Sequence, residues 1–202
     1  MVLAVLAVLV LLQVLPARTR LVPWWLPYIN VAAVLLPIIF PPAKPRWLRV
    51  ERAIARLCVV LVIAMTLVTL GYLVVAMVYR PVEVSGLQLL TTSVGVWFTN
   101  VLAFSLLYWD IDGGGQVERA GRSRRLPDWL FPQVGVPELV PPGWRPTFVD
   151  YLFLAFSTAT AFSTTEVAPL TARAKLLMMA ESSISLVTMV VTASRAINIL
   201  GS

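Results

Sequence analysis

The sequence predicts an all-α integral membrane protein with about five transmembrane helices and a re-entrant helix and loop between the last two. Of its 202 residues, 59% are hydrophobic and only 13% are charged, whereas a soluble domain carries roughly a quarter charged residues. Apolar runs of about 20 residues, the length that crosses a bilayer core as a helix, recur along the chain. Helices also satisfy their own backbone hydrogen bonds, as lipid requires. A soluble domain is therefore excluded.

Composition also narrows the function. The chain has no histidine and one cysteine, Cys58, which nearly excludes a His/Cys metal site and histidine-based catalysis and leaves no disulfide within the chain. No nucleophile–base pair stands out, so we expect neither an enzyme nor a cofactor. The net charge of +6 comes from residues between the apolar runs. This favours anchoring on the lipid bilayer over nucleic-acid binding.

Residues 1–80 are expected to form three membrane helices. The first run, residues 1–17, is marginal in length, and a signal peptide is the alternative, although no basic residue precedes it. The other runs are 21–40 and 57–79. Residues 44–56 carry arginines on one side of a helical wheel, which predicts either an interfacial amphipathic start to the third helix or simple basic anchoring.

Residues 87–202 are expected to form a second unit built around a short helix that cannot span a bilayer. Irregular backbone after such a helix is tolerated at membrane depth only where protein or water covers it. The expected elements are a helix at 87–109, a polar loop at 110–145, a re-entrant helix at 148–160, a filter-like strand at 161–166 and a final helix at 170–200.

This order of elements resembles the pore module of the potassium-channel superfamily. In that family a threonine-rich helix end precedes a Thr-Val-Gly-Tyr-Gly filter, and an Asp and a Pro-x-Thr follow. Here Thr158-Ala159-Thr160 ends the short helix, five residues follow, and Glu166 precedes Pro169-Leu170-Thr171. The resemblance covers 87–202. It implies an ion-channel-like membrane protein, a homo-oligomer with a tetramer favoured, and monovalent cations as ligands.

The resemblance also assigns site residues. Glu166 would stand at the pore mouth, and Ser163 and Thr165 stand where the family has glycines, whose backbone other residues adopt only at a cost. We therefore expect weakly selective or non-selective cation conduction. The alternatives are a non-conducting structural or accessory protein that retains the scaffold and a small-solute transporter. The filter-like strand comprises Thr160, Ala161, Phe162, Ser163, Thr164 and Thr165.

The final helix carries a polar stripe, with residues spaced four, three, four and three apart on one face. An ionisable residue at membrane depth suggests function. Three interpretations remain open: a helix–helix seam, a pore lining that supports the filter, and a proton relay. The stripe comprises Glu181, Ser185, Thr188, Thr192 and Arg195.

A second resemblance concerns location. Segments such as Trp97-Phe98-Thr99-Asn100 and Tyr108-Trp109-Asp110-Ile111-Asp112 are similar to those of an uncharacterised bacterial membrane-protein family. The resemblance implies a bacterial inner membrane. In the same region, Asp110-Ile111-Asp112-Gly113 lacks the later ligands of a calcium loop, so we expect a glycine-ended helix stop.

Orientation is ambiguous. The expected spans place most basic residues on one face and leave only Arg18, Arg20, Arg80 and Arg195 for the other. The positive-inside rule puts the basic face in the cytoplasm, whereas the channel resemblance puts the pore loop, on that same face, outside. We favour the charge rule, which gives an inverted topology like that of glutamate-receptor channels.

Overall fold

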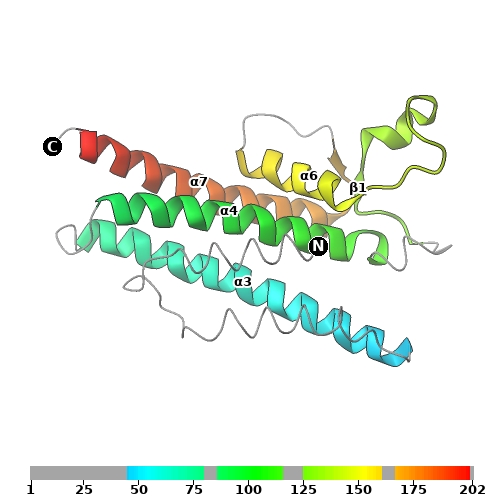
Figure 1. The fold of residues 1–202 in the computed structure, drawn as a ribbon, viewed down its shortest axis with the longest axis horizontal. Coiled ribbons are helices and arrows are strands. Elements are labelled where there is room, and N and C mark those ends of the chain that lie inside the picture. The colour runs from blue at the N-terminus through cyan, green and yellow to red at the C-terminus, as the bar shows by residue number, and fades with distance from the viewer. Residues whose placement is uncertain (1–44, 80–85, 116–124, 161–166, 201–202) are drawn as a thin grey trace.

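The computed structural model describes residues 45–79, 86–115, 125–160 and 167–200, and this part of the chain is mostly helical (Figure 1). The expected spans at 1–17 and 21–40 lie outside the described residues. The described α-helices are α3 (Pro45–Tyr79), α4 (Gly86–Ile111), α6 (Phe148–Thr160) and α7 (Ala172–Leu200). Short elements join them: the 3-10 turns η2 (Asp112–Gly114), η3 (Pro132–Gly135) and η4 (Pro137–Leu139), and the strands β1 (Trp129–Leu130) and β2 (Ala168–Pro169).

The three long helices α3, α4 and α7 lie side by side, and the short helix α6 packs against α4 and α7 (Figure 1). Helix α3 runs antiparallel to α4, because Arg56 near the start of α3 reaches Asp110 near the end of α4 at 2.5 Å. Leu73, later in α3, packs on Val96, earlier in α4. Helices α3 and α4 therefore run in opposite directions.

Two of the described helices are long and apolar enough to cross a membrane, at Thr92–Gly114 and Ala172–Ser194, each of 23 residues. At 1.5 Å per residue such a segment extends about 34 Å, which exceeds the roughly 30 Å of a bilayer core. Val59–Val75 and Phe148–Thr160 are shorter apolar helices. The expectation of membrane-length helices near 87–109 and 170–200 is therefore met, and the count of five spans stays a prediction.

Helix α3 is one continuous helix of 35 residues. The two interpretations of residues 44–56, an interfacial amphipathic start to this helix and simple basic anchoring, both stay predictions. Pro45 occupies the first helical position, where its missing N–H costs nothing. No proline follows before Tyr79, and Gly71 is the only glycine, so no residue breaks the helix between the basic and the apolar part.

The end of α4 is set by glycines, as the sequence predicted. Gly113 and Gly115 have φ of 55° and 97°, a region that other residues rarely adopt. A Cβ on Gly115 would also lie 2.6 Å from the carbonyl oxygen of Asp110. The chain therefore turns out of the helix at η2 and positions the side chain of Asp112 inward, where it is 1% exposed.

The core of the described residues lies where α4, α6 and α7 meet the β1 segment. Trp129 is buried against the ring of Tyr108, with centroids 4.7 Å apart, and its indole N–H donates to the sulfur of Met178 at 3.4 Å. Tyr151 and Leu154 are fully buried on the inner face of α6. The two-residue strands pair antiparallel, with Trp129 opposite Pro169 and Leu130 opposite Ala168.

The final helix starts later than expected, at Ala172 instead of residue 170. Ala168 and Pro169 are held as β2 by the pairing with β1. Thr171 then caps the helix, because its hydroxyl accepts a hydrogen bond from the backbone N–H of Ala174 at 3.3 Å. The proline and the threonine cap together delay the helix by two residues.

Candidate functional site

A group of polar side chains gathers where α4 ends and where α6 and α7 begin. We call this group the clasp. Its members come from four separate segments, and two of them are carboxylates that are almost fully buried. The clasp consists of Asp112, Asp128, Tyr151, Thr171 and Arg173.

Asp112 links the end of α4 to the loop and to α6. Its Oδ1 accepts a hydrogen bond from the backbone N–H of Asp128 at 2.6 Å. Its Oδ2 accepts one from the hydroxyl of Tyr151 at 2.5 Å. The first turn of α6 is therefore tied to the last turn of α4.

Asp128 links the loop to the start of α7. Its Oδ1 accepts from the hydroxyl of Thr171 and from Nε of Arg173, each at 2.7 Å. Arg173 also forms an ion pair through Nη2 with Oδ2 of Asp128, and the same Nη2 donates to the carbonyl of Ile111 at 3.1 Å. The backbone N–H of Leu170 donates to the carbonyl of Asp128 at 2.8 Å. The two bonds from the guanidinium of Arg173 to the carboxylate of Asp128 make a bidentate, charge-assisted contact.

Burial and charge act in opposite directions on Asp128. Burial alone would raise its pKa, but the hydrogen bonds from Arg173 and Thr171 and the positive charge of Arg173 favour the ionised form, and the net effect lowers the pKa below its ordinary value. The Asp128 side chain is 2% exposed and that of Arg173 is 56% exposed. The pair is therefore half open to solvent, and we expect it to stabilise the fold moderately.

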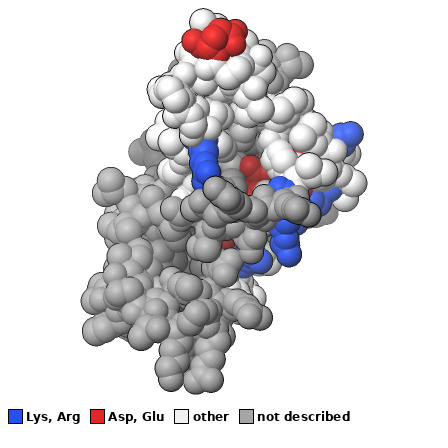
Figure 2. All heavy atoms as spheres, turned by 90° about the vertical axis from the view of Figure 1, so that its right-hand side faces the viewer, with Lys and Arg blue, Asp and Glu red and all other residues white. Residues whose placement is uncertain are grey.

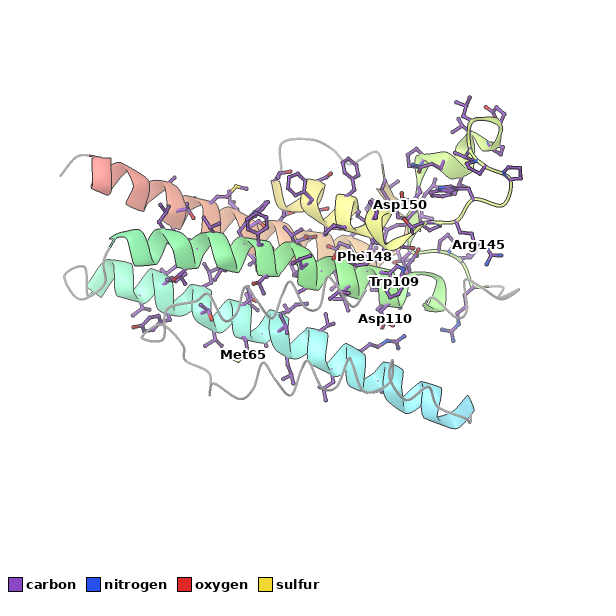
Figure 3. The ribbon with its side chains drawn as sticks, in the orientation of Figure 1. Met65, Trp109, Asp110, Arg145, Phe148 and Asp150 are labelled. Carbon is purple, nitrogen blue, oxygen red and sulfur yellow. The ribbon has the colours of Figure 1, made fainter. Side chains whose placement is uncertain are left out.

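The start of α6 has its own cap at the same end. The carboxylate of Asp150 accepts from the backbone N–H of Thr147 at 2.6 Å and from the Thr147 hydroxyl at 2.8 Å. This is the carboxylate half of a capping box. Phe148 packs edge to face on Trp109 at the end of α4, with ring centroids 6.0 Å apart (Figure 3). Cap and ring contact place the first turn of α6 beside the clasp.

The far end of α6 lies beside α7 about a third of the way along it. The hydroxyl of Ser182 donates to the carbonyl of Thr158 at 3.1 Å. Ser182 is about 15 Å along the axis from the first residue of α7, at 1.5 Å per residue. Helix α6 therefore begins at the clasp and ends about a third of the way along α7, and the chain is again at the clasp at Leu170.

Thr160 is the one residue of the filter-like strand that the structure describes. It is the last residue of α6, it is half-buried, and its hydroxyl donates to the carbonyl of Ser157 at 3.0 Å. The other assigned positions, Ala161, Phe162, Ser163, Thr164, Thr165 and the mouth residue Glu166, lie outside the described residues.

The polar stripe of α7 lies mostly against α4. Glu181 is fully buried, and its Oε2 accepts a hydrogen bond from the hydroxyl of Tyr108 at 2.5 Å. The amide of Asn100 donates to the carbonyl of Glu181 at 3.2 Å and to the hydroxyl of Ser185 at 3.0 Å. The structure therefore brings Glu181 and Ser185 together with two α4 side chains in a buried polar seam.

The remaining stripe residues follow the same face. Thr188 is 1% exposed and its hydroxyl donates to the carbonyl of Ile184 at 2.7 Å. Thr192 is half-buried and donates to the carbonyl of Thr188 at 2.8 Å. Arg195 lies in α7, and its side chain is outside the described part of the structure. This is the placement that the seam interpretation expects, and a role in lining a pore stays a prediction.

Two buried polar atoms of the seam have no hydrogen-bond partner among the described residues, Oε1 of Glu181 and Oδ1 of Asn100. The buried Nε1 of Trp97, on α4, also has none among them. Trp97 also packs edge to face on Phe156 of α6, with centroids 5.7 Å apart. Unpartnered groups of this kind are costly, which makes the junction of α4, α6 and α7 a candidate site.

Basic side chains are exposed at the clasp end of the molecule, which faces the viewer in Figure 2. They come from α3, from the loop and from α7, the segments that the sequence predicted to share one face. The acidic residues of the clasp lie among them. The exposed basic residues that the structure describes at this end are Arg56, Arg125, Arg145, Arg173 and Lys175.

The sequence does not predict the clasp. Asp128 lies in the predicted polar loop at 110–145, and Arg173 lies in the predicted final helix, with no partner indicated for either. Tyr108 of the seam is likewise not predicted as a partner of Glu181. The spacing of Asn100 and Tyr108, two helical turns apart, places them on one face and could have indicated a seam facing Glu181. Comparisons with protein-family models, with curated proteins and with solved structures found no match.

The clasp should make the stability of the fold depend on pH. Asp128→Asn should lower the free energy of unfolding by about 1.5–3 kcal/mol at neutral pH, the usual worth of hydrogen bonds to a charged group. Because the folded-state pKa of Asp128 is lowered, its contribution is present above the ordinary carboxyl range and is lost as the pH falls through the folded-state pKa. Denaturant titrations of both proteins at several pH values measure the difference.

Glu138→Gln is the matched control, because Glu138 is exposed in η4. It should change the free energy of unfolding by less than about 0.5 kcal/mol. A gap between wild type and Asp128→Asn that stays constant down to acid pH would contradict the assignment of the Asp128 charge.

Proposed function

We propose that this chain is an integral membrane protein of pore-loop layout that conducts small monovalent cations, with weak or no selectivity, as a homo-oligomer. One observation carries the proposal. Helix α6 starts at the clasp, its last turn is bonded to Ser182 about a third of the way along α7, and the chain is back at the clasp at Leu170. If α4 and α7 cross a bilayer, this segment enters and leaves on one side.

Such an excursion needs shielding from lipid. Thirteen residues of helix, Phe148–Thr160, extend about 20 Å and cannot cross a bilayer core. Irregular backbone at membrane depth must be covered by protein or line water. The inner face of α6 is covered by α4 and α7, whereas Phe153 and Phe156 are exposed. A ring of copies, with a tetramer favoured, would cover that outer face and enclose an axis.

In this proposal residues 160–165 form the ion path and Glu166 stands at its mouth, as the sequence resemblance assigns them. The hydroxyl of Thr160 donates a hydrogen bond to the carbonyl of Ser157, so the lone pairs of its oxygen remain available to a cation. Glu181 and Ser185 would act as support behind the loop, through their bonds to α4.

A second candidate is a non-conducting accessory protein that keeps this scaffold. The observation that favours it is the burial of Glu181, Ser185 and Thr188 within a single chain, each at 1% exposure or less. A polar seam between α4 and α7 accounts for these side chains without any water path. The two candidates share the fold and differ in flux.

For orientation we propose that the clasp end faces the cytoplasm of a bacterial inner membrane, because the basic residues gather there. In a Cys58→Ser background, Leu139→Cys places a thiol at a site that is 77% exposed in η4. A membrane-impermeant maleimide should label it in opened cells and leave it unlabelled in intact cells. Labelling of intact cells would reverse the orientation. The Cys58→Ser parent measures the background.

Conduction is tested with the purified protein in liposomes that report potassium and sodium flux. Wild type should conduct both ions, and Glu166→Gln should reduce flux at low salt by roughly tenfold, because a mouth carboxylate concentrates cations. Added salt should shrink this difference by screening. Glu138→Gln, which neutralises an exposed loop carboxylate, should leave flux unchanged. Absence of flux for every monovalent cation would reject conduction and favour the accessory protein.

A further inference from the structure

Three acidic side chains are buried in the described part of the chain, and Glu181 differs from the other two. Asp112 and Asp128 each accept several hydrogen bonds, and Asp128 also pairs with Arg173. Glu181 is 0% exposed and accepts one bond, from the neutral hydroxyl of Tyr108. Its Oε1 has no partner in the described structure. It is therefore a buried carboxyl without a countercharge there.

Among the described residues, the groups around Glu181 offer no cation. On its own helix, Arg173 and Lys175 lie in the first turn, and Arg173 is bonded to Asp128. Eight residues separate Arg173 from Glu181, which is about 12 Å along the helix. On α4 the ionisable neighbour is Tyr108 itself, and Asp110 lies further along, paired with Arg56 of α3. Charge compensation from these elements is absent.

The other packed elements add no charge beside Glu181. Helix α6 faces this level of α7 with Thr158, bonded to Ser182, and its ionisable residues Asp150 and Tyr151 are in its first turn. The β1 segment contributes the indole of Trp129, which packs on Tyr108. On α3, Tyr72 is next to Leu73, which packs on Val96, three helical turns of α4 away from Tyr108.

Hydrogen-bond counting then favours the neutral acid. With Glu181 ionised, the seam contains two acceptor oxygens without a partner among the described residues, Oε1 of Glu181 and Oδ1 of Asn100. A proton on Oε1 converts one acceptor into a donor and removes the buried charge. Leaving an ionised carboxylate in an apolar site costs far more than protonating it.

We propose that Glu181 is a proton-binding site, and that its proton holds α4 and α7 together in the seam. Oε2 stays bonded to Tyr108, and the proton resides on Oε1. Loss of the proton places a negative charge between the two helices beside Asn100 and Ser185, which both cross-link the helices at the next turn. Ionisation therefore loosens the packing of α4 on α7. This inference stands whether or not the protein conducts ions.

Infrared spectroscopy tests proton occupancy in the folded protein directly. Wild type at neutral pH should show the C=O stretch of a protonated carboxylic acid, with the downshift that D₂O produces. Glu181→Gln should lose this band, and Glu138→Gln, which removes an exposed carboxylate, should keep it. Absence of the band in wild type, or its persistence in Glu181→Gln, would overturn the proposal.

A pH series tests the coupling to packing. An unfolded glutamate loses its proton near pH 4.3. In this proposal the folded protein still holds the proton above that pH, so the folded state binds the extra proton. Above that pH the folding equilibrium of wild type should weaken relative to Glu181→Gln by about tenfold per pH unit, until Glu181 ionises in the folded state. Glu181→Gln mimics the neutral acid and should match wild type at acid pH.

The contrary outcome is equally clear. If Glu181→Gln is less stable than wild type by a constant amount across the pH range, Glu181 acts as an ionised or purely structural group and the proposal fails. Tyr108→Phe supplies a second readout, because it removes the one donor that favours the carboxylate. It should widen the pH range over which the infrared band persists, and narrowing of that range would also contradict the proposal.

Discussion

The ion pair between Asp128 and Arg173 joins segments that are far apart in the sequence, and the rest of the architecture depends on it. Through Asp112 and Tyr151 the same group of bonds holds the end of α4 and the start of α6. Helix α6 of 13 residues begins at the clasp, and Leu170, after β2, is bonded to Asp128 of the clasp. The clasp therefore supplies the contacts on which the proposed re-entrant topology depends.

The polar groups of the clasp and those of the seam differ in how well they are hydrogen-bonded and in how far solvent reaches them. At the clasp, carboxylates meet several donors, and solvent reaches Arg173, which is 56% exposed. In the seam, Glu181 meets a single neutral donor and Oε1 has no described partner. Hydrogen bonds between helices are the main directional contact available where both the helices and their surroundings are apolar. The seam therefore fixes how α4 packs on α7, and it also buries a carboxyl group, Glu181, whose ionised form is unfavourable there.

The helices could be predicted from the sequence and their contacts could not. Hydrophobic runs located α4 and α7, and the short helix at 148–160 was predicted with the bounds that α6 has. The predicted stripe on α7 includes Glu181, Ser185 and Thr188, which are all buried, and its role stays a prediction. The clasp escaped prediction because two-residue strands leave no periodicity and because ion pairs such as Asp128–Arg173 depend on how a 36-residue loop folds back. The pairing of Tyr108 with Glu181 depends on how α4 and α7 are rotated about their axes, which packing between helices determines and the sequence pattern does not show.

The course of α6 is measured most directly by the depth of spin labels in a bilayer. Val149, Phe156 and Leu170 are all exposed, at 68%, 47% and 49%, and so accept labels without disturbing the core. The depth of each label is measured by comparing how strongly oxygen, which dissolves in lipid, and a nickel complex, which dissolves in water, relax its spin. The labels at 149 and 170 should lie near one surface, and the label at 156 should lie deep in the hydrocarbon. Equal depths at all three positions, or labels at 149 and 170 that respond to a nickel complex added on opposite sides, would contradict a re-entrant α6.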